Sequence, residues 1–534
     1  MSRFVRASKY RHVFGQTGKK EYGFDNIKVT GSAWDTNVVA ASARYISINW
    51  NSSGGGAFAI LPLPSPFNHL PHNLPSKLPD IIPLARSHTG PVLDTAWSPF
   101  NDSIVASGAE DGKVMVWKVE DSLYEGWGQE HWEPQDFDPV ARIEVSPRRV
   151  GQVLFHPTAE HVLATSTGDH LVKLWDLNNP EQSRSVLHGH GDAIQSLTFN
   201  PNGNLLVTTC RDRKIRIFDP RSGGDAVRVA EGHGGIKGAR VVWMGDKDNI
   251  ATTGFSKMSD RQVGIWETGN LNNIKMTTID QTSGVLMPFW SDNNLLFLAG
   301  KGDGNIRYYE WENEVMFPLS EHKSADPQRG MCFLPRRALS VSDCEIARAY
   351  KVAANSIEAI AFIVPRKADS FQSDIYPLAP SAEPALTAFE FFSGQNAPAK
   401  FISLENGDIF TGPNPSAAPA PTPSAAPQAT RTASAPAPSP VSAPAPAPVQ
   451  VATPEVLSPV ASFRSERSES TFSPPTPISR SQSTAGEEEL SSLKSENDKL
   501  TAELRESREK IRNLELQVES AKANARKAAA LLNA

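Results

Sequence analysis

The stretch EDGKVMVW at residues 110–117 is an acidic turn followed by alternating residues that end on a tryptophan. Asp111 and Trp117 lie six residues apart. Alternation of this kind predicts a β-strand, and an aspartate before a glycine is typical of the tight turn that leads into one. The stretch therefore predicts a short turn between two strands.

The same pattern recurs four more times along the chain, as GDHLVKLW (168–175), RDRKIRIF (211–218), SDRQVGIW (259–266) and GDGNIRYY (302–309). The paired residues of the five copies are Asp111 and Trp117, Asp169 and Trp175, Asp212 and Phe218, Asp260 and Trp266, Asp303 and Tyr309. Successive aromatic residues are separated by 58, 43, 48 and 43 positions. This spacing is close to the period of a four-stranded propeller blade.

Three of the repeats also carry a histidine before their first strand, namely His88, His190 and His233. The aspartate can accept hydrogen bonds from turn amides and from this ring, which would stabilise each blade by about 1.5–3 kcal/mol. Each closing aromatic would bury roughly 150–250 Å². The second repeat has Val145-Ser146 in place of Gly-His, so we expect Asp169 to lack a histidine partner. We interpret all these residues as structural.

Residues 30–63 and 329–364 contain strand-like runs that can supply two further blades. The sequence then predicts an all-β fold, a seven-bladed WD40-type β-propeller over residues 1–365. Such a ring has to close, because an open end leaves unpaired strand edges. The segment KYRHVFG near the N-terminus is the candidate for the strand that completes the last blade.

Residues 411–485 hold 17 of the 42 prolines, with alanine and serine filling most of the rest. This composition cannot bury enough apolar surface to offset the entropy of ordering, so it predicts a disordered linker. Residues 486–534 contain no proline and predict a helical oligomerisation domain.

A heptad frame from Leu490 to the chain end predicts a coiled coil in this last region. Asparagine at an a position is typical of a dimer, whereas KIRNLE (510–515) resembles a trimerisation motif, so dimer and trimer both stay open. The residues expected at the helix contact are Leu493, Asn497, Leu500, Leu504, Lys510, Ile511, Leu514, Glu515 and Val518.

Composition and motifs argue against several functional classes. The net charge of −6 shows no nucleic-acid signature, and no apolar run is long enough for a membrane span. Three cysteines cannot form a disulfide framework, which favours a reducing, cytoplasmic location. HGHGD (188–192) is better explained as a repeat start than as a metal site, and GKGDG (300–304) as a hairpin turn than as a phosphate cradle. We therefore expect no metal, no cofactor and no enzymatic activity.

Basic residues are concentrated at the N-terminus. Residues 1–28 carry seven lysines and arginines against two acidic residues, which gives +7 − 2 = +5. The candidate binding residues here are Arg6, Lys9, Arg11, Lys19, Lys20 and Lys28. A cationic surface multiplied by an oligomeric tail would bind a repeating acidic polymer with avidity. The chain is thus predicted to crosslink such a polymer.

The sequence resembles the coronin family. The resemblance rests on RASKYRHVFGQ (6–16), GGGAFAILPL (54–63), TGFSKMSDRQVGIW (253–266), GKGDGNIRYYE (300–310), DPQRGMCFLP (326–335) and VPRKADSFQSDIYP (364–377). It implies an extension at residues 366–410 that packs on the propeller. It also implies binding to filamentous actin, homo-oligomerisation, and regulation of the actin-nucleating complex of actin-related proteins in the cortical actin cytoskeleton.

Within the resemblance, Lys28 in DNIK matches a basic family position in the actin contact that is often arginine. Lysine keeps the charge but not the bidentate fork. Ser2 lies in a basic context, and its phosphorylation would add negative charge to the cationic segment. The alternative to a filament crosslinker is a general WD-repeat scaffold for assemblies in trafficking or signalling.

Overall fold

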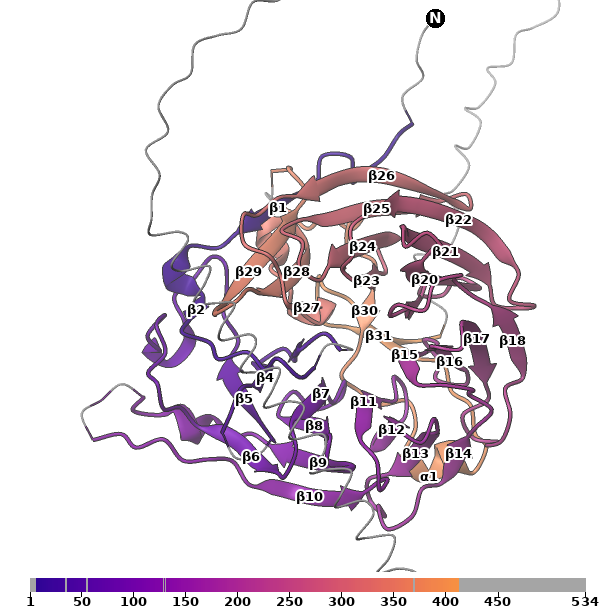
Figure 1. Cartoon of the computed structure of the whole chain (residues 1–534). Helices are drawn as coiled ribbons and strands as arrows, with labels where there is room; N and C mark the ends of the chain where they lie inside the picture. Colours follow the sequence, from indigo (N-terminus) through magenta and orange to yellow (C-terminus); the bar gives the residue numbers. More distant parts are fainter. Residues whose placement is uncertain are drawn as a thin grey trace, which may run out of the picture. The chain divides into compact units, whose positions relative to one another are not determined.

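The computed structural model describes residues 6–33, 36–53, 56–127, 129, 131–367 and 370–412. These residues form seven antiparallel sheets arranged in a ring, with the first strand of each sheet toward the centre (Figure 1). The predicted seven-bladed β-propeller is confirmed.

Each of the first six blades is a meander of four consecutive strands. The first two comprise β3 (Val39–Ala41), β4 (Tyr45–Trp50), β5 (Gly56–Pro62) and β6 (Leu84–His88), then β7 (Val92–Trp97), β8 (Ile104–Ala109), β9 (Lys113–Lys118) and β10 (Pro139–Glu144). The third and fourth comprise β11 (Val150–Phe155), β12 (Val162–Thr167), β13 (Val172–Asp176) and β14 (Ser185–Leu187), then β15 (Ile194–Phe199), β16 (Leu206–Cys210), β17 (Lys214–Phe218) and β18 (Arg228–Glu231). The fifth and sixth comprise β19 (Arg240–Trp243), β20 (Asn249–Phe255), β21 (Arg261–Glu267) and β22 (Asn273–Asp280), then β23 (Leu286–Ser291), β24 (Leu295–Gly300), β25 (Ile306–Glu312) and β26 (Val315–His322).

The seventh blade joins the two ends of the ring. Its inner strands are β27 (Gly330–Phe333), β28 (Glu345–Val352) and β29 (Ser356–Ile363). The outer strand comes from the N-terminus: β1 (Phe14–Thr17) pairs with β29 from Phe14↔Ile363 to Thr17↔Ile360, and β2 (Phe24–Asp25) continues the pairing. The predicted closing segment therefore lies directly before and within β1.

Burial explains why the N-terminal segment stays in place. Val13 is 2% exposed, and its carbonyl accepts a hydrogen bond from the Tyr308 hydroxyl at 2.8 Å. The Tyr10 hydroxyl accepts a hydrogen bond from the Asn293 side chain at 3.0 Å. Both contacts tie the segment to the sixth blade, so β1 closes the ring through side chains as well as through its strand pairing.

Antiparallel pairing gives the ring two faces, which we name by their turns. The upper face carries the turns between the second and third strands of each blade and the links to the next blade. The lower face carries the turns between the first and second strands and between the third and fourth strands. Short 3₁₀ segments interrupt the loops at Lys20–Tyr22, Pro71–Asn73, Asp121–Tyr124, Arg336–Ala338 and Val341–Asp343.

Residues after the seventh blade return to the lower face. They form β30 (Ala379–Pro380), β31 (Lys400–Ile402) and β32 (Ile409–Thr411) in one small sheet, and the helix α1 (Ala388–Phe392). Thr387 and Glu390 cap α1 reciprocally, so the helix starts where the TAFE motif indicates. The amides of Ala385 and Leu386 donate to the Thr158 carbonyl at 2.9 and 3.1 Å, which attaches this segment to the third blade.

Candidate interaction surface

The repeat residues of the second blade form a buried chain of hydrogen bonds. His88 Nδ1 lies 3.0 Å from Asp111 Oδ2, and its Nε2 lies 2.8 Å from the Ser107 hydroxyl. Trp117 Nε1 donates to the same hydroxyl at 2.9 Å, and the Thr89 amide donates to Asp111 at 2.9 Å. Burial opposes ionisation of Asp111, but the bonds from His88 and from turn amides outweigh it and lower its pKa. Here the structure brings the predicted residues together.

In the fourth blade, the predicted pairing between His190 and Asp212 is wrong. Arg216 forms a salt bridge with the Asp212 carboxylate instead, with Nη1 at 3.1 Å from Oδ1 and Nη2 at 2.5 Å from Oδ2. His190 Nδ1 faces the His170 carbonyl at 3.1 Å, and Nε2 faces the Thr208 hydroxyl at 3.0 Å. A charged guanidinium fork binds a carboxylate more strongly than a neutral imidazole does, which explains the exchange. Phe218 is fully buried at the predicted aromatic position.

The fifth blade also departs from the prediction. Asp260 accepts a hydrogen bond from the Ser256 hydroxyl at 2.8 Å rather than from His233. His233 Nε2 faces the Thr252 hydroxyl at 2.9 Å, to which Trp266 donates at 2.7 Å. The turn between β20 and β21 is longer than in the earlier repeats, and it contains Ser256, whose hydroxyl binds Asp260.

The third and sixth blades have no histidine before their repeat aspartates. In the third, the neighbouring Thr167 and Ser146 hydroxyls lower the pKa of Asp169 although burial opposes this, and Trp175 donates to Thr165 at 3.0 Å. In the sixth, Asp303 pairs with a buried arginine that is described below. Tyr309 is only half-buried, whereas its neighbour Tyr308 is 1% exposed.

One set of structural residues was missed in the sequence. A hydroxyl on the second strand of the second to fifth blades bonds the tryptophan or the histidine of its blade; the set is Ser107, Thr165, Thr208 and Thr252. The signal was available, since the first three lie four residues before the repeat aspartate.

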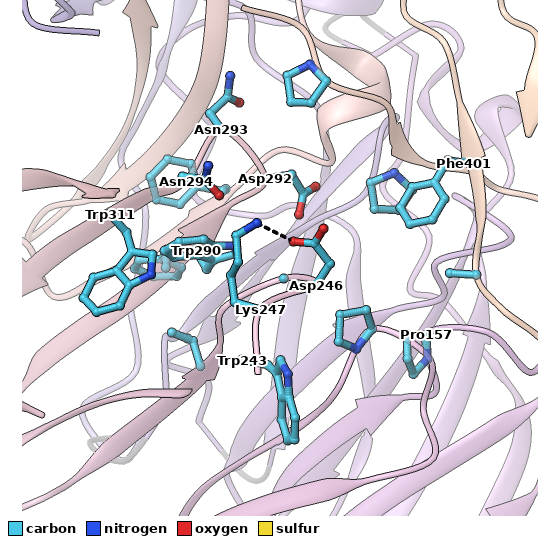
Figure 2. Close-up of a pocket in the computed structure, with 18 of the residues that line it drawn as sticks. Pro157, Trp243, Asp246, Lys247, Trp290, Asp292, Asn293, Asn294, Trp311 and Phe401 are labelled. Atoms are coloured by element: carbon cyan, nitrogen blue, oxygen red, sulfur yellow. Dashed lines mark ion pairs between the residues drawn. The ribbon is translucent and has the colours of Figure 1, made fainter. Parts of the chain in front are cut away.

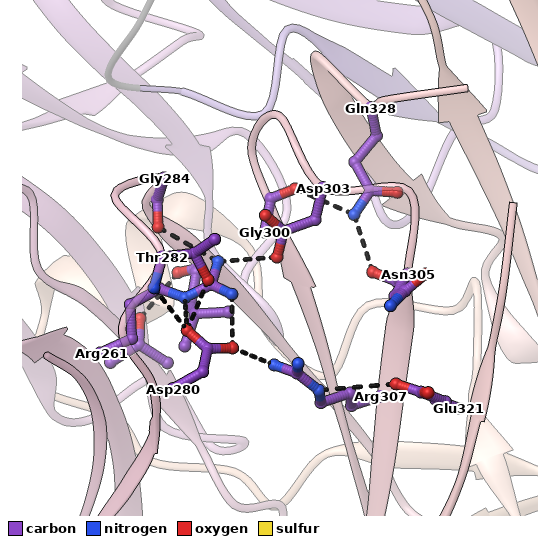
Figure 3. A network of polar contacts seen from close by, with 12 residues as sticks. Arg261, Asp280, Thr282, Gly284, Gly300, Asp303, Asn305, Arg307, Glu321 and Gln328 are labelled. Atoms are coloured by element: carbon purple, nitrogen blue, oxygen red, sulfur yellow. Dashed lines mark hydrogen bonds and ion pairs between the residues drawn. The ribbon is translucent and has the colours of Figure 1, made fainter. Parts of the chain in front are cut away.

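A charged network joins the fifth and sixth blades (Figure 3). Arg261 is 1% exposed and binds Asp280 through two bonds of 2.6 Å and Asp303 through one of 2.7 Å. Arg307 also contacts Asp280 and reaches Glu321 at 3.7 Å. Burial opposes ionisation of Asp280, but these donors hold its pKa well below the usual range. The network is structural, because its charges are paired with one another.

The predicted N-terminal cations are separated by the structure. Arg6 contacts Glu310 and Glu312 at the lower end of the sixth blade, and its guanidinium lies 4.2 Å from the centre of the Phe317 ring. Lys9 donates to the Asp374 carbonyl at 2.8 Å. Arg6 is therefore occupied within the propeller, which is contrary to a role for it as an open contact.

Four other predicted cations remain accessible around the seventh blade. Arg11 is half-buried near the lower face, and Lys19 and Lys20 are exposed on the rim, where Lys19 is 70% exposed. Lys28 lies toward the upper face, because neighbouring Ile27 bonds Asn355 in the upper turn of the seventh blade. The Lys28 ammonium lies 3.8 Å from the carboxylate of Asp80, whose side chain is 84% exposed, and donates to the Asp80 carbonyl at 3.1 Å. Such an exposed pair contributes only about 0–1 kcal/mol, so Lys28 can exchange this partner.

A cavity of about 960 Å³ lies on the lower face, between the propeller and the segment after it. Trp243, Trp290, Trp311 and Phe401 line it, and an ion pair of 3.1 Å joins two further lining residues, Lys247 and Asp246 (Figure 2). Phe401 belongs to β31, whereas the tryptophans belong to the fifth and sixth blades. The segment after the propeller thus completes one wall of the cavity.

Several predicted residues lie outside the described part of the chain. They are Ser2 and the expected coiled-coil residues Leu493, Asn497, Leu500, Leu504, Lys510, Ile511, Leu514, Glu515 and Val518. Over the residues that the structure does describe, no cluster of three or more metal-ligating side chains occurs. Nor does that part of the chain contain a helix long and apolar enough to cross a membrane.

Family models match three parts of the chain. A domain of unknown function (DUF1899) matches residues 3–67, the WD domain G-beta repeat matches 82–118 and 181–219, and a further type of WD40 repeat matches 357–399. The first of these spans β1, β2 and the predicted cations, and the G-beta repeats lie on blades. The match at 357–399 runs from β29 into the segment after the propeller and includes β30 and α1.

Curated relatives cover most of the chain. A coronin-like protein of Schizosaccharomyces pombe is 50% identical over 75% of this chain, and one of Saccharomyces cerevisiae is 44% identical over 78%. The chain spans 65% and 62% of those two proteins. Coronin-A of Dictyostelium discoideum is 44% identical over 77% of this chain and 88% of its own length.

A solved structure agrees with these relatives. The WD40 domain of Toxoplasma gondii coronin superposes with a TM-score of 0.66 at 27% identity, over 74% of this chain and 97% of that one. Sequence and fold point to the same family, and the chain belongs to the coronins.

Proposed function

We propose that the protein binds actin filaments through the cationic edge of the seventh blade. The contact consists of Lys19, Lys20 and Lys28, with Arg11 at its lower end. The exposure of the three lysines carries this proposal, since Lys19 and Lys28 are 70% and 43% exposed and their ion pairs both measure 3.8 Å. The closer contact of Lys28 is an exposed hydrogen bond to the Asp80 carbonyl at 3.1 Å. Cations held this loosely can be transferred to an acidic filament surface at small cost.

Arg6 has a different role in this proposal. It anchors the N-terminal segment on the sixth blade by contacting Glu310 and Glu312. That segment leads into β1, which closes the ring. Arg6 therefore positions the edge that carries the lysines and does not itself contact the filament.

The tail would convert one filament site into several. The heptads of residues 486–534 predict a dimer or trimer, and linked sites gain roughly 10²–10⁴ in apparent affinity on a repeating target. The protein would thereby bundle filaments and regulate the nucleating complex of actin-related proteins in the cortical actin cytoskeleton. We infer a binding protein rather than an enzyme.

Charge reversal tests the filament site. The variant Lys19→Glu/Lys20→Glu/Lys28→Glu should bind actin filaments about 10–100-fold more weakly in cosedimentation, because three cationic contacts become repulsive. The loss should be larger at low salt, where exposed charges are screened least.

A matched control reverses three exposed cations on other blades. Lys118→Glu/Arg142→Glu/Lys275→Glu changes the net charge equally but leaves the seventh blade intact. It should cosediment nearly as the parent protein does. Equal losses in the two variants would show a general charge effect, and parental binding by the first would exclude this edge as the filament site.

A further inference from the structure

Three turns on the upper face of the fourth and fifth blades form one surface. They are residues 211–213 between β16 and β17, 232–238 between β18 and β19, and 256–260 between β20 and β21. The Gly232 amide donates to the Arg213 carbonyl at 2.7 Å, and the Gly235 amide donates to the Phe255 carbonyl at 2.8 Å. These bonds hold the three turns against each other. We name the surface the upper patch; its outward side chains are Arg211, Arg213, Ile236, Lys237, Lys257 and Met258.

Two large apolar side chains on this patch face solvent. Met258 is 83% exposed and Ile236 is 62% exposed. Their backbones nevertheless make hydrogen bonds: the Met258 amide donates to the Ser256 hydroxyl at 3.1 Å, and the Ile236 carbonyl accepts from the Gln195 side chain at 3.5 Å. Ordered turns that hold two such side chains on one surface offer a partner apolar contacts beside the cations of the patch.

The cations around them are only weakly compensated. Arg211 lies 4.0 Å from Asp192, at the limit of an ion pair. Lys237 stacks its ammonium over the Phe255 ring, 4.9 Å from the centre. Within the described residues, no carboxylate lies at ion-pair distance from Arg213, Lys237 or Lys257. Among the described residues, the four cations of the patch thus have a single carboxylate at ion-pair distance, that of Asp192. The patch is therefore cationic although the whole chain has a net charge of −6.

We propose that the upper patch binds an acidic peptide segment of a partner protein, one that also carries large aliphatic side chains. Charge complementarity selects the acidic partner, because four clustered cations would attract it and orient it. Met258 and Ile236 would contact the aliphatic side chains of the peptide, because methionine adapts readily to the shape of a bound side chain.

The exposed side chains favour a peptide over a nucleic acid. Single-stranded nucleic acids bind on aromatic platforms that stack the bases. The upper patch presents aliphatic side chains, and the nearby aromatic rings of His233 and Phe255 are buried at 5% and 1% exposure. The patch is also distinct from the proposed filament site, since the whole sixth blade lies between the fifth and seventh blades.

Fluorescence anisotropy on the full chain tests the proposal. The probe is a labelled twelve-residue peptide that repeats Glu-Glu-Leu. Arg213→Glu/Lys257→Glu should weaken its binding about tenfold or more, and Ile236→Ser/Met258→Ser about fivefold to tenfold. Lys118→Glu/Arg142→Glu, with the same charge change on the second blade, should bind the peptide as the parent does. Thermal unfolding of each variant checks that the blades stay folded.

Two further probes and one further assay separate the alternatives. An all-glutamate peptide should bind more weakly than the probe; equal binding would overturn the apolar half of the proposal. Binding of oligothymidylate that outcompetes the peptide would instead assign the patch to nucleic acid. No binding of the peptide, or equal binding by the charge-reversed and control variants, would overturn the proposal.

Filament cosedimentation of Arg213→Glu/Lys257→Glu should match the parent, and its loss would assign the patch to actin.

Discussion

Asp94 is a carboxyl group in an environment that disfavours its charge. It lies on β7, the inner strand of the second blade, and accepts a hydrogen bond from the Val153 amide at 3.0 Å. Burial raises the pKa of Asp94 to about 7. Because this value lies above the unfolded value of about 4, the stability that Asp94 contributes is complete below pH 4 and is lost as pH rises through 7.

The substitution Asp94→Asn should remove this pH dependence. An amide oxygen still accepts from Val153 but never ionises, so the variant should gain on the order of 1–3 kcal/mol over the parent at pH 8. At pH 5 the gain should be much smaller. Thermal unfolding at both pH values measures the difference, with the exposed Asp326→Asn as control. A gain of equal size at pH 5 and pH 8 would contradict the assigned titration.

At the residue scale, the sequence predicted contacts only between residues at a fixed spacing within one repeat. The contact between His88 and Asp111 follows from the repeat, and the structure contains it. The partner of Asp212 was wrong, because the competing Arg216 lies on the same strand and the repeat pattern does not rank donors by strength. Residue spacing also could not predict which of the basic residues are exposed. Arg6, for example, pairs with Glu310, which lies in a distant part of the chain.

At the scale of elements, Arg261 connects two neighbouring blades. It begins β21 in the fifth blade and reaches Asp303 in the turn between β24 and β25 of the sixth. Arg261→Met should lower the free energy of unfolding by about 2–4 kcal/mol, because two half-buried carboxylates lose the arginine that they share and only Asp280 keeps a second one, Arg307. Urea denaturation measures this loss.

An arginine on an outer strand provides the comparison. Arg142 is exposed on β10, so Arg142→Met should change the free energy of unfolding by less than about 0.5 kcal/mol. Similar losses in the two variants would show that the network contributes no more than a surface charge. The double variant Arg261→Met/Asp280→Asn should recover part of the loss, since it removes one of the unpaired charges.

The inner strands of five blades were predicted from a short pattern, and the first and seventh blades only from strand-like runs without that pattern. The reason is physical: β9 and its counterparts pack on both faces and begin at a constrained turn, which leaves a strong signature. The seventh blade carries none of the paired residues, and its outer strand comes from the other end of the chain. The need to close the ring, rather than any motif, predicted that pairing.

At the scale of the whole molecule, the proposed function depends on more than one copy of the filament site. A single edge with three lysines binds weakly, and crosslinking needs two such edges in one particle. The sequence of residues 486–534 predicts that particle through heptads, in which Leu500 and Leu514 occupy d positions and Ser495 and Ala502 occupy outward f positions.

The variant Leu500→Asp/Leu514→Asp should therefore sediment as a monomer and lose filament bundling, which is measured as actin pelleted at low speed. It should still bind filaments, more weakly than the parent, when filaments are pelleted at high speed. Ser495→Asp/Ala502→Asp introduces two aspartates, and thus the same charge change, on the outward face and should keep both oligomer and bundles. Deletion of residues 486–534 should reproduce the first variant. If bundles survive that deletion, a second filament site must lie in the rest of the chain, and avidity through the tail would no longer explain crosslinking.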